Sequence, residues 1–349
     1  MLFRLQSPPV RLASLAALSA LLAPVAIATR PALAQTVTAI ARLGCTPQEQ
    51  TQTQQMPWCS NLHNRAIRAV RFSPNGQFLA SGSIDQTAKI WNLSASLQRN
   101  GSPALVRTLA ARTEQVLALA FSPDGTVLAT GGGGQESGLK LWDWQRGTLL
   151  YEFPRYRAIV FAIAFSPDGR YLASGGNDNV IRVWDLSNRT LLSELPEEQQ
   201  ILSLTFSPDG KTLVSTTLGR TVKLWNLEDE EVETALGPYV HPVWSVAFTP
   251  DGDRMIYSAK RGGIRDEPTN TVRVWDLEGE PEQTLQAHDG EIKSIALSPN
   301  GRFVVSGGLD NTVKLWDLET NLPIAFQAQH DSEIWSVAFS SDNRTFASG

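Results

Sequence analysis

The sequence predicts an all-β protein assembled from a repeated unit. The turn motif Ser-Pro-[Asp/Asn]-Gly or a close variant recurs six times, at Ser73, Ser122, Ser166, Ser207, Thr249 and Ser298. Trp followed by Asp or Asn also recurs six times, at Trp91, Trp142, Trp184, Trp225, Trp275 and Trp316, with spacings of 51, 42, 41, 50 and 41 residues. The base period is therefore about 41, and two copies carry insertions.

Each repeat reads as four short strands. "VWSVAFTPDG" (243–252) alternates apolar residues and ends in a turn motif, and "RMIYSA", "TVRVWDL" and "EQTLQAH" follow it as three more strands. No segment after residue 35 shows the apolar periodicity of an amphipathic helix. The chain is 42% hydrophobic and 19% charged with 26 Gly and 20 Pro, which is typical of a globular, turn-rich protein.

These repeats resemble the WD-repeat β-propeller family from Ile67 to Gly349, and the N-terminal sequence suggests an exported, bacterial member. The resemblance implies four-stranded blades packed around a central channel. We expect a seven-bladed propeller with six complete blades and a truncated seventh. The alternative is a complete six-bladed ring followed by a vestigial extra unit.

The truncation is expected because residues 334–349 repeat only the first half of a unit. Family members often close the ring with a strand from the other terminus, since an open sheet edge invites aggregation. Thr36 to Leu43 alternates like such an outer strand. No segment suggests the third strand, so the sequence reads as a fragment cut within its final repeat.

The N-terminal segment has the layout of a secretory signal peptide. Arg4 and Arg11 precede eighteen uncharged residues, and Ala32 and Ala34 form a small-x-small cleavage site. The predicted organisation is a signal peptide at 1–34, an N-terminal segment with a closing strand and a disulfide loop at 35–62, and the propeller at 63–349. A periplasmic or secreted location follows; the alternative is anchoring by an uncleaved N-terminal helix.

The net charge bears on the class of partner, and the two cysteines bear on disulfide formation. Removing 1–34 lowers Lys plus Arg from 30 to 27 against 35 Asp plus Glu, so the net charge falls from −5 to −8. Nucleic acid is therefore not expected as a partner. Cys45 and Cys59 are expected to form a disulfide, since the protein is predicted to be exported.

The family resemblance also implies a structural role for the histidines. In this family a His, a Ser, an Asp and the Trp pin each blade through buried hydrogen bonds. Two repeats carry all four: His63, Ser81, Asp85 and Trp91, and His288, Ser306, Asp310 and Trp316. A third has Tyr156 in place of His, a fourth has Gly219 in place of Asp, and His330 opens the last repeat.

We expect no enzymatic activity, cofactor or metal. The chain lacks the motifs of serine hydrolases and zinc peptidases, and "GKT" at 210–212 lacks the upstream Gly of a phosphate-binding loop. The Ser, His and Asp sets match the spacing of blade pinning instead.

Partner binding is then the predicted function. The family binds partners on the face where the first strands begin and the second strands end. The first set of positions is Arg68, Leu117, Phe161, Leu202, Trp244, Lys293 and Trp335, and the second is Ile84, Asn177 and Leu309. Aromatic and basic residues together are typical of binding hot spots. We therefore expect a protein-interaction scaffold outside the cytoplasm; binding of a small molecule or glycan by this aromatic face is the alternative, and a propeller enzyme is a more distant one.

Overall fold

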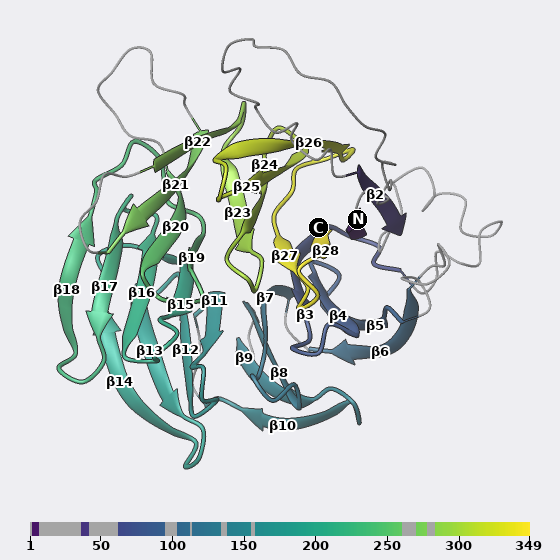
Figure 1. Ribbon diagram of the computed structural model, residues 1–349. Helices are drawn as coiled ribbons and strands as arrows, with labels where there is room; N and C mark the ends of the chain where they lie inside the picture. Colours follow the sequence, from purple (N-terminus) through teal and green to yellow (C-terminus); the bar gives the residue numbers. More distant parts are fainter. Residues whose placement is uncertain are drawn as a thin grey trace, which may run out of the picture.

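The architecture was determined from a computed structural model (Figure 1). The structure describes residues 2–6, 36–41, 62–94, 103–111, 114–133, 138–154, 158–259, 270–277 and 283–349. All secondary structure in these residues is β-strand, arranged in seven four-stranded antiparallel sheets. The all-β propeller is confirmed. Cys45, Cys59 and Tyr156 lie outside the described residues.

Six sheets are each built from four consecutive strands, and we number these blades 1 to 6 along the chain. They are blade 1, β3 (Ile67–Phe72), β4 (Phe78–Ser83), β5 (Thr87–Asn92) and β6 (Ala104–Ala110); blade 2, β7 (Gln115–Phe121), β8 (Val127–Gly133), β9 (Leu139–Asp143) and β10 (Thr148–Glu152); blade 3, β11 (Val160–Phe165), β12 (Tyr171–Gly176), β13 (Val180–Asp185) and β14 (Thr190–Pro196); blade 4, β15 (Ile201–Phe206), β16 (Thr212–Thr217), β17 (Val222–Asn226) and β18 (Glu231–Leu236); blade 5, β19 (Val246–Phe248), β20 (Arg254–Ala259), β21 (Asn270–Asp276) and β22 (Gln283–His288); and blade 6, β23 (Ile292–Leu297), β24 (Phe303–Gly308), β25 (Thr312–Asp317) and β26 (Leu322–Gln329). The first strand of each blade lies near the centre of the ring and the fourth at its outer rim (Figure 1).

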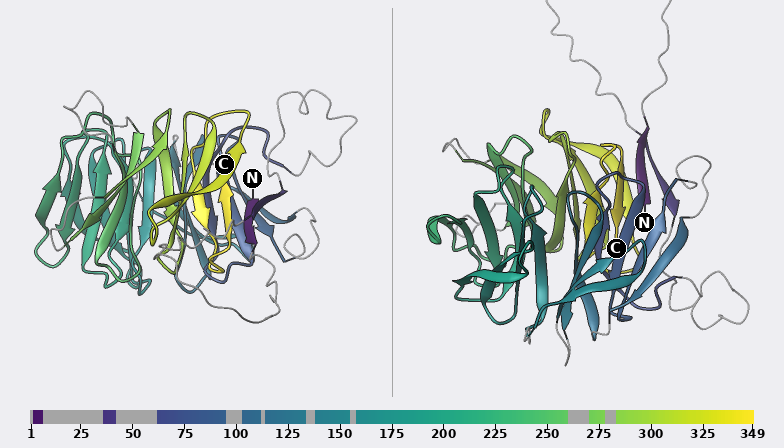
Figure 2. Two further views of the ribbon diagram at one scale, coloured as in Figure 1. Left: turned by 45° about the horizontal axis from the view of Figure 1, so that its top comes forward. Right: turned by 90° about the horizontal axis from the view of Figure 1, so that it is seen from below.

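The remaining sheet, which we call the closing sheet, combines the two ends of the chain. Its order is β2 (Thr36–Ala41), β1 (Leu2–Gln6), β28 (Thr345–Ser348) and β27 (Val337–Phe339). The outer strand β2 covers Thr36 to Ala41 of the segment expected to close the ring, Thr36 to Leu43. The expectation that the chain has no third strand is wrong, because β1 pairs with β28 from Leu2 opposite Ala347 to Arg4 opposite Thr345. The two ends of the chain accordingly lie close together in the closing sheet (Figure 2).

The closing sheet fits between blades 6 and 1. On one side Val337 N donates to Ser294 Oγ at 3.0 Å, and on the other Val70 N donates to Ser336 Oγ at 3.0 Å. Ile334, Val337 and Phe346 share a buried cluster with blade 6, and Ala338 and Ala347 share one with blade 1. Residues 334–349 therefore do not pack outside the ring, as a vestigial unit would.

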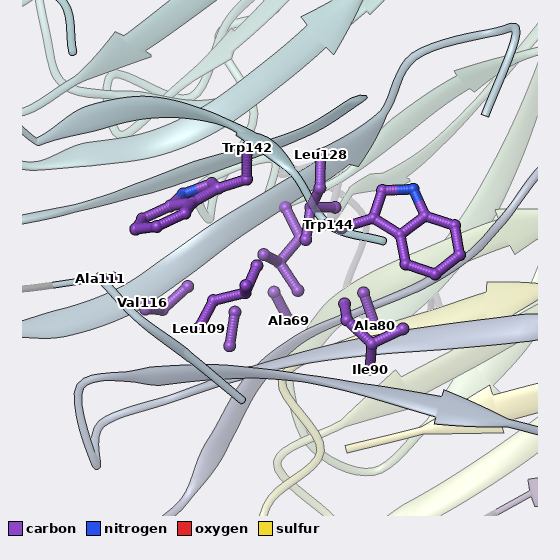
Figure 3. Packing of buried hydrophobic residues seen from close by; sticks show 11 residues of the cluster. Ala69, Ala80, Ile90, Leu109, Ala111, Val116, Leu128, Trp142 and Trp144 are labelled. Carbon is purple, nitrogen blue, oxygen red and sulfur yellow. The ribbon is translucent and has the colours of Figure 1, made fainter. Parts of the chain in front are cut away.

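The hydrophobic core lies between adjacent sheets, so each blade is held by its neighbours. Between blades 1 and 2, Trp142 and Trp144 pack with small and branched residues such as Ala69, Ala80 and Ile90 (Figure 3). Bulky residues of one sheet thus meet small residues of the next, which lets the two faces approach closely. Gly82 shows the constraint, because an added Cβ would come within 2.7 Å of Val116 Cγ1.

The repeated turn motif joins the first and second strands of each blade. In blade 3 Ser166 Oγ donates to Asp168 Oδ1 at 2.5 Å, and Arg170 N donates to the same oxygen at 3.0 Å. Gly169 completes the turn at φ 72°, a conformation that favours glycine. Because each of these turns follows the innermost strand of its blade, the turns lie at the end of the channel opposite to the end where the innermost strands begin. No helix in the described residues is long and apolar enough to cross a membrane.

Candidate functional site: blade pinning and the channel mouth

Buried hydrogen bonds pin blade 1 as the resemblance implies. His63 Nδ1–H donates to Asp85 Oδ2 at 2.7 Å, His63 Nε2 lies 2.7 Å from Ser81 Oγ, and Trp91 Nε1 donates to Ser81 Oγ at 2.8 Å. Burial acts to raise the pKa of Asp85, but the hydrogen bond and charge of His63 outweigh it and lower the pKa to about 2. His63 and Ser81 are both fully engaged inside the blade, so neither is placed to act on a substrate.

Blade 6 reproduces this arrangement with one difference. His288 Nδ1 lies 2.9 Å from both carboxylate oxygens of Asp310, and Nε2 lies 2.8 Å from Ser306 Oγ. Burial acts to raise the pKa of Asp310, but His288 lowers it well below its usual range. Trp316 Nε1, however, is buried and finds no hydrogen-bond partner among the described residues. Three members of this set interact as expected and the fourth does not.

Blades 4 and 5 keep the position of the His and Ser pair but change its chemistry. Glu197 takes the place of the His in blade 4: it accepts a short hydrogen bond from Ser215 Oγ, 18 residues on, and lies 2.8 Å from Lys223 Nζ. In blade 5 the pair is Tyr239 and Tyr257, with hydroxyl oxygens 2.7 Å apart. The interpretation by motif recognised Ser215 as the serine of its repeat but missed Glu197, Lys223, Tyr239 and Tyr257, although the spacing of 18 would have found Glu197 and the two tyrosines.

The first set of predicted partner-binding residues comes together at one end of the channel. Each residue follows the first apolar residue of an innermost segment, and together they line a cavity of about 330 Å³. We call this set the channel mouth: Arg68, Leu117, Phe161, Leu202, Trp244, Lys293 and Trp335. The second predicted set, Ile84, Asn177 and Leu309, does not line this cavity. Asn177 instead fixes the backbone, because its Oδ1 accepts from Ile159 N at 2.7 Å.

Two tryptophans and two cations contact one another in the channel mouth. The Trp244 and Trp335 rings meet edge to face with centroids 6.2 Å apart. Lys293 Nζ lies 3.4 Å from the Trp244 centroid, and Arg68 Cζ lies 3.4 Å from the Trp335 centroid. Cations over indole faces are stabilised by the ring quadrupole, so the four side chains hold one another in place.

Glu291 supports this group from the rim. It accepts from Lys293 Nζ at 2.7 Å and from Trp244 Nε1 at 3.2 Å, and His241 Nδ1 lies 3.4 Å from its other oxygen. Burial lowers the pKa of Lys293, and Glu291 offsets this only in part. No cluster of three or more potential metal-ligating side chains occurs in the residues described here.

A family model decides what this architecture is. The model described as "WD domain, G-beta repeat" matches residues 59–92, 103–143, 147–185, 189–226, 236–276, 279–317 and 322–349. The chain belongs to the WD40 repeat family. The seven matches include the half-repeat at the C-terminus, which contributes β27 and β28 to the closing sheet.

Curated relatives agree with this assignment. The chain is 25% identical over 257 residues to "WD repeat-containing protein 26 homolog" of Arabidopsis thaliana, covering 74% of this chain and 34% of that protein. It is 27% identical over 293 residues to "F-box-like/WD repeat-containing protein TBL1X" of Mus musculus, covering 81% of this chain and 55% of that protein. The chain thus spans about a third to about half of these relatives. Both are eukaryotic, so they lend no support to a bacterial origin.

Proposed function

We propose that this WD40 protein is a non-enzymatic scaffold whose channel mouth binds a segment of a partner protein. The observation that carries the proposal is the convergence of Trp244, Trp335, Arg68 and Lys293 on one half-buried cavity. Tryptophan and arginine in a partly desolvated pocket are the residues that dominate binding energy at protein interfaces.

The hydrogen bonds of three histidines support a non-enzymatic role. His63, His288 and His330 each lie 2.7 to 2.8 Å from the hydroxyl oxygen of a serine 18 residues further along the chain, in the sheet that follows the histidine. They are therefore occupied in holding blades together. The names of relatives point the same way: the chain is 31% identical over 140 residues to "Small ribosomal subunit protein RACK1y" of Oryza sativa, which by that name is part of a larger assembly.

A pull-down with a matched control tests the proposal. The double variant Trp244→Ala plus Trp335→Ala removes the aromatic pair from the channel mouth. As a control, Leu192→Ala plus Leu322→Ala removes two apolar side chains from the outer strands β14 and β26. These two leucines are exposed to a similar extent, 54% and 56%. We expect the wild type and the leucine variant to recover the same partner and the tryptophan variant to lose it. Equal recovery by all three would refute the proposed face.

The cavity itself favours a second candidate, a small molecule or glycan. Its volume of about 330 Å³ falls at the lower end of ligand-binding pockets, and aromatic side chains commonly stack on sugar rings. Mass spectrometry of the protein purified under native conditions distinguishes the two candidates. A bound small molecule that is released by Trp244→Ala would favour this second function over a protein partner.

We also propose that the protein acts outside the cytoplasm, in the periplasm or secreted, with anchoring by an uncleaved N-terminal helix as the alternative. The support is the apolar segment followed by Ala32 and Ala34. Cleavage after Ala34 would remove β1 and leave β2, so the exported chain and the complete closing sheet are mutually exclusive. Intact-mass measurement of the exported protein should give a chain beginning at Gln35, lighter by two hydrogens because of a Cys45–Cys59 disulfide. A chain retaining residue 2, or two free thiols, would contradict these assignments.

For the ring we propose seven blades, with the closing sheet as the seventh. Support comes from the packing of β27 and β28 between blades 6 and 1. A crystal structure should place seven innermost segments around one channel. Six closed blades with residues 334–349 elsewhere would refute the count.

A further inference from the structure

One position of the innermost segments carries a large residue in a single sheet, and only there does the residue line the channel cavity. Three residues beyond each channel-mouth residue, the innermost segments carry small side chains in six sheets: Ala120, Ala164, Thr205, Ala247, Ala296 and Ala338. In blade 1 the same position of β3 is Arg71. Since alanine or threonine suffices at this position elsewhere in the ring, propeller packing does not require the guanidinium.

The Arg71 side chain reaches into the channel cavity rather than into the blade. Its side chain is open to solvent through the 330 Å³ cavity that it lines with the channel mouth, although the surrounding protein is dense enough to lower its pKa by desolvation. Nη1 donates to Val70 O at 2.8 Å and to Ser336 Oγ at 3.4 Å, both neutral acceptors. A guanidinium has five N–H donors, so most of them remain available to a ligand.

Arg71 also differs from the other two cations in its charge environment. Lys293 is paired with Glu291 at 2.7 Å, and the charge of Glu333 acts on Arg68. No carboxylate in the described part of the chain acts on Arg71, whose pKa is lowered by burial without an opposing acid. An enclosed guanidinium without a counter-charge gains most from an anion of complementary geometry.

All charged residues that line the cavity are positive. It includes Arg68, Arg71 and Lys293 and no aspartate or glutamate, although the protein as a whole carries a net charge of −5. A cavity with cationic walls inside an acidic protein concentrates the field on a small anionic group.

We infer that the channel mouth takes a peptide segment with an acidic side chain, and that Arg71 binds its carboxylate at the bottom of the cavity. The inference rests on the proposed function and adds the chemistry of the partner to it. Trp244 and Trp335 would contact the apolar part of the same segment above the carboxylate. Arg71 is therefore the specificity-determining residue, and the tryptophans provide contact area.

Selection from a random peptide-display library tests this without a known partner. Peptides selected on the wild-type protein should be enriched in Asp and Glu, and those selected on Arg71→Ala should not. For one selected peptide, calorimetry should show affinity weakened about 10-fold or more both by Arg71→Ala and by replacing the peptide's acid with its amide, with no further loss when the two changes are combined.

Two controls keep the outcomes separate. Arg344→Ala removes an exposed arginine from the turn between β27 and β28, away from the channel mouth, and should bind like the wild type. Arg71→Ala should melt like the wild type, because alanine is the residue present at this position in most other sheets. Selected peptides that need Trp244 and Trp335 but show no acid enrichment would overturn the inference and leave the proposed function standing. Peptides that need neither tryptophan, or no selection at all, would overturn both.

Discussion

Two positions recur in the repeats with fixed spacing, yet they vary in opposite ways. The pinning pair, two residues 18 apart in sequence, keeps a hydrogen bond whatever its chemistry; the described pairs are His63–Ser81, Glu197–Ser215, Tyr239–Tyr257, His288–Ser306 and His330–Ser348. The channel-mouth positions share neither a residue type nor an interaction from one repeat to the next, since Leu, Phe, Trp, Arg and Lys occupy equivalent places. Variation that preserves an interaction indicates a structural role, whereas variation that preserves none leaves the residue free to serve binding.

The largest expected effect is the loss of stability when the serine of a pinning pair is replaced by alanine. Ser81→Ala removes the hydrogen-bond partner of both His63 Nε2 and Trp91 Nε1 and leaves two buried polar groups unsatisfied. We expect the free energy of unfolding to fall by about 2–4 kcal/mol. Ser306→Ala removes only the bond to His288, since Trp316 Nε1 has no partner in the described part of the chain.

Ser306→Ala should therefore cost about half as much as Ser81→Ala. Urea denaturation of both variants measures the difference. Equal losses would show that Trp91 gains nothing from Ser81 and would remove the distinction between blades 1 and 6.

The next effect concerns acid stability. The pKa of Asp85 is lowered from 3.8 to about 2 in the folded protein, so its contribution is fully present above pH 4 and is lost as the pH falls from about 4 to 2. The shift corresponds to roughly 2 kcal/mol. Melting temperatures of wild type and Asp85→Asn, measured from pH 6 to pH 2, should converge as the pH falls. A difference that stays constant over this range would show that Asp85 is not held ionised by His63.

The smallest effect concerns blade 5. Tyr239→Phe and Tyr257→Phe should each reduce the free energy of unfolding by about 1 kcal/mol, because each removes one side of a buried hydroxyl pair. The double variant should lose little more than either single one, and the double-mutant cycle in urea reports this coupling. Additive losses would mean that the two hydroxyls do not stabilise each other in blade 5.

The sequence predicted the repeats and the channel mouth well because both follow from local patterns. Turn motifs and alternating strands set the register, and the register alone brings Arg68, Trp244 and Trp335 to one end of the channel. The substitutions Glu197 and Tyr239 were missed because hydrogen-bonding equivalence across different side chains is not visible in a motif. β1 was missed because "LFRLQ" carries no strand signal distinct from a signal peptide; its pairing depends on the exposed edge of β28, which only the folded chain presents.

The central claim is that partners dock at the channel mouth, and site-specific photo-crosslinking tests it most directly. Benzoylphenylalanine in place of Phe161, which lines the cavity, should crosslink to the partner recovered by the wild type. The same group in place of Leu192, exposed on outer strand β14, should not. Crosslinks from Leu192 with none from Phe161, although the partner is still captured, would contradict the account.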